Sequence, residues 1–296
     1  MIPTHNRPDE VRRAVRSALE QDYEGSIEVI VVFDASDPFE FDVPEAPNRS
    51  IRTTRNNRTR GLAGGRNTGI LAAEGEYVAF LDDDDWWQSD KIRRQIELID
   101  RDPAMPLVGA GMTVVTPQGD TPRPISRNPV TLVDLVRDRI PELNACGIMV
   151  RRSDALGDLG LVDEALPGSY GEDYDLLLRA ARLHPIAVVD DPVVMVQWNG
   201  TSLFGRKWRM IADALEYLLD KHPEIVDDRK GFARIAGQIA FARAALDERR
   251  AARSWARKAL RADAGQARAY LALAVSYHVV TPERVLSALN RRGRGI

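Results

Sequence analysis

Four consecutive carboxylates that directly follow an apolar run constrain this chain more than any other feature. Residues 77–81 (YVAFL) favour a strand, and Asp82-Asp83-Asp84-Asp85 comes next, before Trp86-Trp87. Adjacent carboxylates repel one another, so a folded chain keeps them together when a cation compensates them or when they splay into water. A solvated turn is the ordinary interpretation of such a run. Its place between a buried-looking strand and two tryptophans instead favours a site for Mg²⁺ or Mn²⁺.

Four further blocks accompany the acid run. They are Ile2-Pro3-Thr4-His5-Asn6-Arg7-Pro8, residues 28–36 (EVIVVFDAS), residues 61–73 with Gly65-Arg66-Asn67-Thr68-Gly69, and Gly171-Glu172-Asp173-Tyr174-Asp175-Leu176. In order and spacing, the five blocks resemble the family-2 glycosyltransferases over about the first two hundred residues. This resemblance implies an inverting enzyme with a GT-A fold, which is an α/β fold with a mixed central sheet.

The resemblance also implies a role for each matching residue. Pro3, Thr4 and Asp34 would hold the nucleoside and Arg66 the donor diphosphate, while Asp82 would lie toward the ribose, Asp83 beside it and Asp84 toward the metal. Asp173 would be the catalytic base, with Glu172 beside it on the acceptor side. Asp83 and Asp85 leave the register of the Asp-x-Asp pair open.

Ordinary structural roles remain open for the same residues. Asp34 could cap a turn or helix, Arg66 could be a surface residue, and Glu172 and Asp173 could be first-turn acids of a helix. Three departures from the family pattern add to this. Only Met1 and Ile2 precede Pro3, so we expect either a short first strand or a true start that lies upstream. Phe33 replaces an acid, which leaves base specificity open. Trp198-Asn199 stands where many relatives have a histidine.

Composition excludes several classes of protein. The 296 residues carry a net charge of -3, which gives no case for nucleic acid as the main partner. A single cysteine, Cys146, rules out an internal disulfide, and four scattered histidines show no zinc spacing. The sequence lacks a bilayer-spanning apolar run and a signal peptide, so we expect a cytoplasmic protein. The tail Arg291-Arg292-Gly293-Arg294 leaves peripheral contact with the inner membrane face open.

The periodicity of the chain predicts two parts. The family resemblance implies a glycosyltransferase domain over residues 1–205, with a nucleotide-binding half (1–105) and an acceptor half (106–205). The helical periodicity that follows predicts an all-α domain over residues 206–296. Strands are expected at 27–33 and 107–116, and a surface loop over 37–60. Residues 232–264 resemble a tetratricopeptide helix pair, which leaves a protein partner open.

The preferred function is metal-assisted transfer of a sugar from a nucleoside-diphosphate donor, with a UDP-sugar favoured. The acceptor would be a hydroxyl or amine of a glycan, a lipid-linked saccharide or a small molecule. Two alternatives stay open. One is a catalytically inactive glycosyltransferase-like module that acts through its helical domain, and the other is a nucleotidyltransferase.

Overall fold

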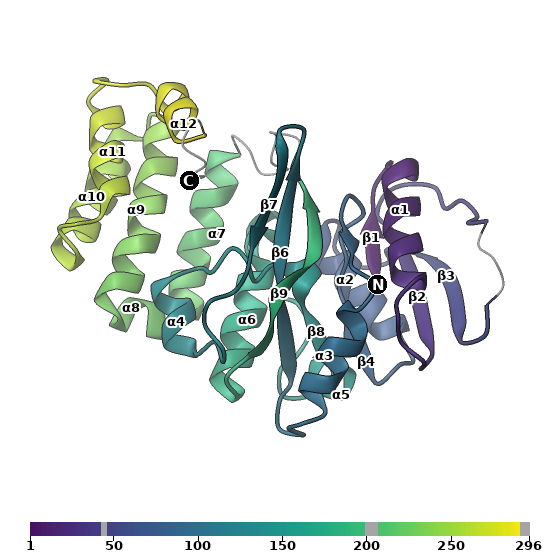
Figure 1. Cartoon of the computed structure of the whole chain (residues 1–296). Helices are drawn as coiled ribbons and strands as arrows, with labels where there is room; N and C mark the ends of the chain where they lie inside the picture. The colour runs from purple at the N-terminus through teal and green to yellow at the C-terminus, as the bar shows by residue number, and fades with distance from the viewer. Residues whose placement is uncertain (43–45, 199–206, 291–296) are drawn as a thin grey trace. The chain divides into compact units, whose positions relative to one another are not determined.

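The computed structural model describes residues 1–42, 46–198 and 207–290 (Figure 1). Within these ranges the chain forms two compact units. The first holds residues 1–135, 139–164 and 172–198, and the second holds residues 136–138, 165–171 and 207–290. Two features of the sequence, Asn199 and the basic tail from Arg291, lie outside the described residues.

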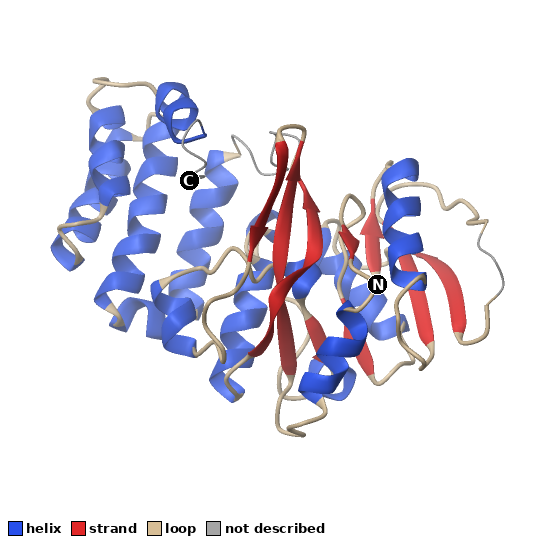
Figure 2. Ribbon diagram, viewed as in Figure 1, coloured by secondary structure: helices blue, strands red, loops and turns tan. Residues whose placement is uncertain are grey.

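A parallel three-stranded sheet begins the first unit (Figure 2). Its strands are β1 (Ile2–Thr4), β2 (Ile27–Phe33) and β3 (Arg49–Arg55), in the order β1-β2-β3. The last five residues of β2 are buried, as expected for a strand covered on both faces. Two helices, α1 (Pro8–Leu19) and α2 (Leu62–Ala72), pack against this sheet.

Strand β3 shows that one prediction was wrong. We expected a surface loop over residues 37–60, but residues 49–55 pair in register with the whole of β2. None of the side chains of β3 is buried. Because β3 lies at the edge of the sheet, it does not need the continuous apolar run that identifies β2.

The second sheet of this unit is mixed. Its strands are β4 (Tyr77–Ala79), β5 (Trp86–Trp87), β6 (Leu107–Thr116), β7 (Gly119–Arg123), β8 (Met149–Arg151) and β9 (Ala187–Gln197). The order is β4-β8-β6-β9-β5, and β7 pairs with β6. β6 runs parallel to β9 and antiparallel to β7 and β8, so the predicted mixed sheet is confirmed. The helices between residues 91 and 183 are α3 (Lys91–Ile99), α4 (Leu132–Arg137), α5 (Arg152–Ala155) and α6 (Glu172–Leu183).

Backbone hydrogen bonds of Met1 connect the two sheets. Its amino group donates to the carbonyl of Ala79 at 2.8 Å, and its carbonyl accepts from the amide of Leu81 at 3.2 Å. The chain that leaves β4 therefore lies beside β1. This arrangement brings the acid run next to the end of the first strand.

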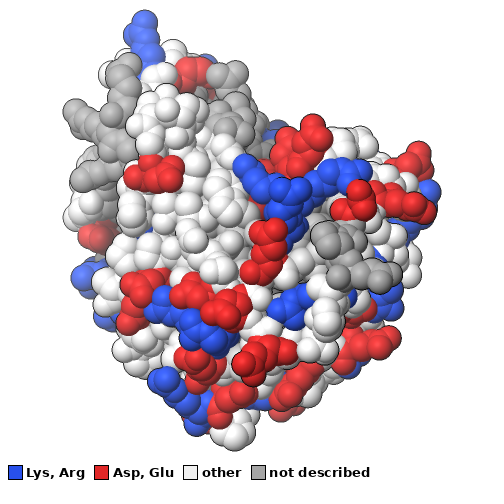
Figure 3. All heavy atoms as spheres, turned by 45° about the vertical axis from the view of Figure 1, so that its right-hand side comes forward, with Lys and Arg blue, Asp and Glu red and all other residues white. Residues whose placement is uncertain are grey.

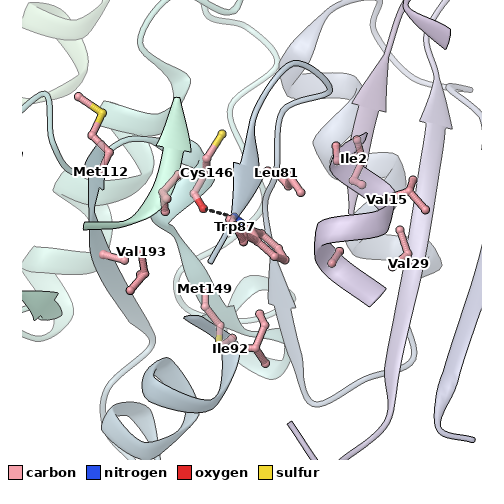
Figure 4. Close-up of a cluster of buried hydrophobic side chains, with 14 of the residues drawn as sticks. Ile2, Val15, Val29, Leu81, Trp87, Ile92, Met112, Cys146, Met149 and Val193 are labelled. Atoms are coloured by element: carbon pink, nitrogen blue, oxygen red, sulfur yellow. Dashed lines mark hydrogen bonds between the residues drawn. The ribbon is translucent and has the colours of Figure 1, made fainter. Parts of the chain in front are cut away.

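Trp87 lies in a hydrophobic core that both sheets share (Figure 4). It is 7% exposed, and its Nε1 donates to the carbonyl of Cys146 at 2.9 Å. Ile2, Val29 and Met149 belong to the same buried cluster. Burying each such apolar side chain contributes roughly 1.5–3 kcal/mol, so the core directly beneath the acid run is firmly packed.

The C-terminal part is all-α, as predicted. Its helices are α7 (Trp208–Lys221), α8 (Pro223–Asp227), α9 (Arg229–Ala245), α10 (Arg249–Ala262), α11 (Ala267–Ser276) and α12 (Pro282–Asn290). Buried alanines such as Ala240, Ala252 and Ala272 let α9, α10 and α11 approach closely. The tetratricopeptide resemblance stays a prediction. Among the helices of the described residues, none has the length and apolar character needed to cross a bilayer.

Candidate active site

The acid run follows β4, and its four side chains alternate in burial. Asp83 and Asp85 are 7% and 5% exposed. The side chains of Asp82 and Asp84 are 30% and 38% exposed. Because two of the four carboxylates are buried, the run is not the solvated turn that its sequence alone permits. The two more exposed carboxylates, Asp82 and Asp84, are the pair that was predicted to form the Asp-x-Asp motif.

The end of β1 and the turn after it hold Asp83 and Asp84. Thr4 Oγ1 donates to Asp83 at 2.8 Å, and Arg7 Nη1 donates to Asp83 at 2.9 Å and to Asp84 at 2.7 Å. Burial raises the pKa of Asp83 to about 6, even though Thr4 and Arg7 lower it. The predicted nucleoside residue Thr4 thus lies beside the acid run.

Asp85 faces the interior. Its carboxylate accepts from Cys146 Sγ at 3.0 Å and from the amide of Gln197 at 2.9 Å. Burial, and then the charge of Asp82, raises the pKa of Asp85 to about 8. Burial also raises the pKa of the Cys146 thiol well above its ordinary value. These contacts anchor the acid run to β9 and to the segment before β8.

Arg66 on α2 links the acid run to the first turn of α6. It is 2% exposed, pairs with Asp82 at 2.7 Å and also pairs with Glu172. Burial opposes the charge of Arg66, but Asp82 and Glu172 raise its pKa above the ordinary value. The alternative of a surface arginine is therefore wrong. Contact between Arg66 and the donor diphosphate stays a prediction.

Asp173 follows Glu172 in the first turn of α6 and has its own cation. Arg139 Nη2 donates to both carboxylate oxygens of Asp173, at 2.9 and 3.1 Å. Burial raises the pKa of Asp173, but Arg139, together with Arg66 and the amide of Tyr174, holds this pKa below its ordinary value. Glu172 and Asp173 therefore each pair with an arginine from a distant segment, which ordinary helix capping does not require.

Asp34 lies at the carboxyl end of β2, where it organises a loop. One carboxylate oxygen accepts from Asn56 Nδ2 at 2.7 Å, and the other accepts from the amide of Gly61 at 2.9 Å. Gly61 precedes the first residue of α2. The capping alternative for Asp34 therefore has partners, and its contact with the nucleoside stays a prediction.

Small residues at the start of α2 let two neighbours approach its backbone. A Cβ on Gly64 would lie 1.8 Å from the carbonyl oxygen of Thr59, and one on Gly65 would lie 3.2 Å from the Cβ of Pro3. The loop before α2 and the predicted nucleoside residue Pro3 thus pack directly on the helix that carries Arg66.

Three residues of this site were outside the sequence prediction. Arg7 belongs to the opening block, and its positive charge was a signal that it could pair with the acid run. Arg139 and Glu164 belong to no block that carried the prediction. Glu164 accepts from Asn67 Nδ2 at 2.7 Å, pairs with Arg58, and so ties residues 58–67 to a distant segment.

Two groups of side chains could hold a metal ion. Asp82, Asp85 and Cys146 place ligand atoms within 4.8 Å of one another. However, Cys146 donates to Asp85, and a thiol is a poor ligand for Mg²⁺ or Mn²⁺. These ions use one or two protein carboxylates and complete their shell with water and phosphate. The partly exposed carboxylates of Asp82 and Asp84 fit that requirement, and a cation would offset the burial and the charge of Asp82 that raise the pKa of Asp84.

Comparison with known families identifies the chain. The sequence model described as "Glycosyl transferase family 2" matches residues 1–160. The matched span is more than half of the chain and includes Asp34, Arg66 and the acid run. This chain belongs to glycosyltransferase family 2. Within this family 2 chain, Glu172 and Asp173 lie beyond the matched span.

Two curated relatives illustrate the similarity. The succinoglycan biosynthesis protein ExoO of Rhizobium meliloti is 33% identical over 195 residues, which cover 61% of this chain and 54% of the relative. The Escherichia coli UDP-Glc:alpha-D-GlcNAc-diphosphoundecaprenol beta-1,3-glucosyltransferase WfaP is 37% identical over 101 residues, which cover 34% of this chain and 40% of the relative. The chain therefore spans about half or less of the length of these relatives.

Solved structures show the fold of this family 2 chain. A crystal structure of S. aureus TarS 1-349 in complex with UDP matches with a TM-score of 0.61 and 18% identity, covering 99% of this chain and 91% of that one. The mannosyltransferase PcManGT from Pyrobaculum calidifontis, in complex with GDP-Man and Mn²⁺, matches with a TM-score of 0.55 and 16% identity, covering 96% and 81%. The predicted GT-A fold with a helical C-terminal part is confirmed.

Proposed function

We propose that this family 2 protein is an inverting glycosyltransferase. It transfers a sugar from a nucleoside-diphosphate donor to an acceptor hydroxyl or amine, assisted by Mg²⁺ or Mn²⁺. The observation that carries the proposal is the row of contacts from Asp82 through Arg66 to Glu172, which lies next to Asp173 in sequence. It joins the residues expected at the donor to those expected at the acceptor.

The donor would lie at the carboxyl ends of β1, β2 and β4. Thr4 and Asp34, with Pro3 beneath them, would face the nucleoside, as ligands of open α/β sheets lie at such strand ends. A UDP-sugar is the favoured donor, because TarS was crystallised with UDP and WfaP is named for UDP-Glc. Arg66 would meet the diphosphate, where a guanidinium can bridge two phosphate oxygens.

Asp84, together with the outward oxygen of Asp82, would hold the divalent ion. When bound, the ion would supply Lewis-acid stabilisation of the negative charge on the departing diphosphate. The PcManGT structure contains Mn²⁺, which supports this part of the proposal. Arg7 would keep the carboxylate of Asp84 ionised and oriented through their 2.7 Å contact.

Asp173 would take the proton of the acceptor hydroxyl while the oxygen attacks the anomeric carbon opposite the departing nucleotide. Its lowered pKa keeps this carboxylate ionised at neutral pH, because Arg139 stabilises the charged form. Glu172, the neighbour on the acceptor side, would hold Arg66 in place through their buried ion pair. One ionised base suffices for an inverting displacement.

The names of two relatives support the proposed acceptor class. WfaP is named for a diphosphoundecaprenol-linked sugar, and ExoO for the biosynthesis of succinoglycan. A lipid-linked saccharide is therefore the favoured acceptor, ahead of a free glycan or a small molecule.

A donor panel tests the proposal. Purified protein is incubated with UDP-, GDP-, dTDP- and CDP-sugars, Mn²⁺ and polyprenyl-diphosphate saccharides, and released nucleotide is measured with the glycosylated product. We expect turnover with one donor class and a loss of at least ~100-fold in Asp173→Asn. Asp191→Asn, whose side chain is 70% exposed, is the control. Release of pyrophosphate from a nucleoside triphosphate would indicate a nucleotidyltransferase instead, and nucleotide binding without any turnover would indicate an inactive module.

A further inference from the structure

Charge is distributed unevenly along the chain, although the net charge is small. Residues 229–290 carry twelve Lys and Arg against four Asp and Glu, whereas residues 1–228 carry twenty-six against forty. The helices from α9 to α12 thus have a net charge of +8, and the preceding residues have one of -14. Such an asymmetry favours an anionic partner for the basic part.

Helix α10 concentrates this positive charge. It contains six Lys or Arg residues and no acid. Arg250, Arg257, Lys258 and Arg261 are exposed. Among the described residues, no carboxylate forms an ion pair with any of these four, whereas Arg249 pairs with Asp247 at 2.8 Å. By contrast, Lys and Arg lie beside Asp and Glu over much of the face drawn in Figure 3.

The opposite face of α10 is buried against neighbouring helices. Ala252, Ala256 and Ala259 are all 0% exposed and belong to the core that α10 forms with α9 and α11. The apolar face of α10 is therefore not free to insert into a lipid bilayer. It can offer a partner only its charged face, which is suited to electrostatic docking on a surface.

Exposed apolar side chains lie at one end of this charged face. The guanidinium of Arg253 lies 4.0 Å from the ring centroid of Tyr277. Tyr277 is 55% exposed, and Val279, two residues later, is 78% exposed. Tyrosine beside basic residues is typical of the membrane–water interface, where an amphipathic ring lies at the level of the head groups. An exposed valine gains nothing from a nucleic-acid backbone but does gain from lipid.

We propose that this surface docks the protein on an anionic lipid bilayer. It is formed by Arg250, Arg257, Lys258 and Arg261, with Tyr277 and Val279 at its edge. The inference rests on the proposed function, because a lipid-linked acceptor is confined to such a bilayer. The negative charge of residues 1–228 opposes adsorption through that part, so the contact forms through the helical segment.

Vesicle sedimentation tests this surface independently of catalysis. Full-length protein is mixed with phosphatidylcholine vesicles that contain about one third phosphatidylglycerol, or none. Each Lys or Arg near an anionic surface strengthens binding roughly five-fold, so R250Q/R257Q/K258Q/R261Q should lower the partition coefficient by ~100-fold or more. The control R16Q/R55Q/R101Q/R127Q removes the same charge from exposed positions of the first unit and should change it only a few-fold.

The outcomes separate clearly. Binding that requires phosphatidylglycerol, weakens with salt and is lost in the α10 variant alone supports the proposal. Equal binding by the α10 and control variants overturns it. So does tighter binding of wild-type protein to random duplex DNA than to the anionic vesicles at the same salt concentration. The α10 variant should keep UDP affinity and melting temperature, so a failure of docking is distinguishable from a failure of the proposed function.

Discussion

Arg66 and Glu172 form a buried ion pair although 106 residues separate them in the chain. Their side chains are 2% and 6% exposed, and Arg66 also contacts Asp82 at 2.7 Å. Burial, Asp173 and Asp82 raise the pKa of Glu172, whereas Arg66 lowers it. The guanidinium therefore stabilises two carboxylates where the proposed donor and acceptor sides meet.

Replacing Arg66 by Gln should be severe for both stability and turnover. The change leaves Glu172 and Asp82 without their common cation, and removing one partner of a buried pair costs about 3–5 kcal/mol. We expect a large fall in melting temperature and turnover reduced by at least ~100-fold. Arg93→Gln is the matched control, because its pair with Glu97 is exposed and worth less than about 1 kcal/mol. Equal melting temperatures for the two variants would contradict the role of Arg66.

Arg139→Gln should change the pH profile. Because Arg139 lowers the pKa of Asp173, its removal should raise that pKa. The acidic limb of kcat/KM should therefore move to higher pH, with activity falling most below neutral pH. Arg137→Gln is a close control, since Arg137 is 55% exposed and pairs with Asp228 instead. An unmoved acidic limb in Arg139→Gln would show that Asp173 is not the group that titrates.

Glu164 should contribute stability that acid removes. Although burial raises its pKa, hydrogen bonds from Asn67, Arg58 and Thr59 lower it from 4.5 to about 2. The stabilisation is fully present above the ordinary pKa and is lost as pH falls toward the folded value. Thermal melts should therefore show Glu164→Gln less stable than wild type at pH 7, with the difference shrinking toward pH 2. Glu74→Gln, at an 86% exposed side chain, should show no such convergence.

Lys91 is a buried cation whose removal should stabilise the protein. It is 0% exposed, its Nζ lacks a hydrogen-bond partner among the described residues, and it lies 3.8 Å from the Trp87 ring centroid. Burial lowers its pKa to about 7, so wild-type stability should rise between about pH 7 and the ordinary value of 10.5. Lys91→Met should melt higher than wild type below pH 7, and the gain should shrink at alkaline pH. Lys230→Met, at an exposed lysine, is the control and should melt as wild type does. A Lys91→Met variant that melts lower than wild type below pH 7 would contradict the prediction.

Local sequence patterns predicted the strands that consist of a continuous run of apolar residues. The apolar run 27–33 forms β2, and residues 107–116 form β6 with the expected bounds. Strand β3 was missed because an edge strand can keep half-exposed polar side chains, so its formation depends on β2. Its arginine-rich composition favours a loop until that partner is known.

In the candidate site, the carboxylates were predictable from the sequence and their arginine partners were not. The acid run and the pair Glu172-Asp173 stand out as carboxylates beside predicted elements. Their counter-charges do not, because Arg139 and Arg66 reach them only through tertiary packing. A surface arginine and a buried one are indistinguishable in sequence until the residues that cover them are known.

The measurement that tests the account most directly is a calorimetric titration of the protein with UDP, with and without Mn²⁺. If the acid run forms a metal-assisted donor site, UDP should bind tightly only with Mn²⁺, and Asp84→Asn should weaken binding by ~100-fold or more. Asp22→Asn, with a 74% exposed side chain, should bind as wild type does. Binding of UDP that is equal without Mn²⁺, or equal in Asp84→Asn, would contradict the proposed site.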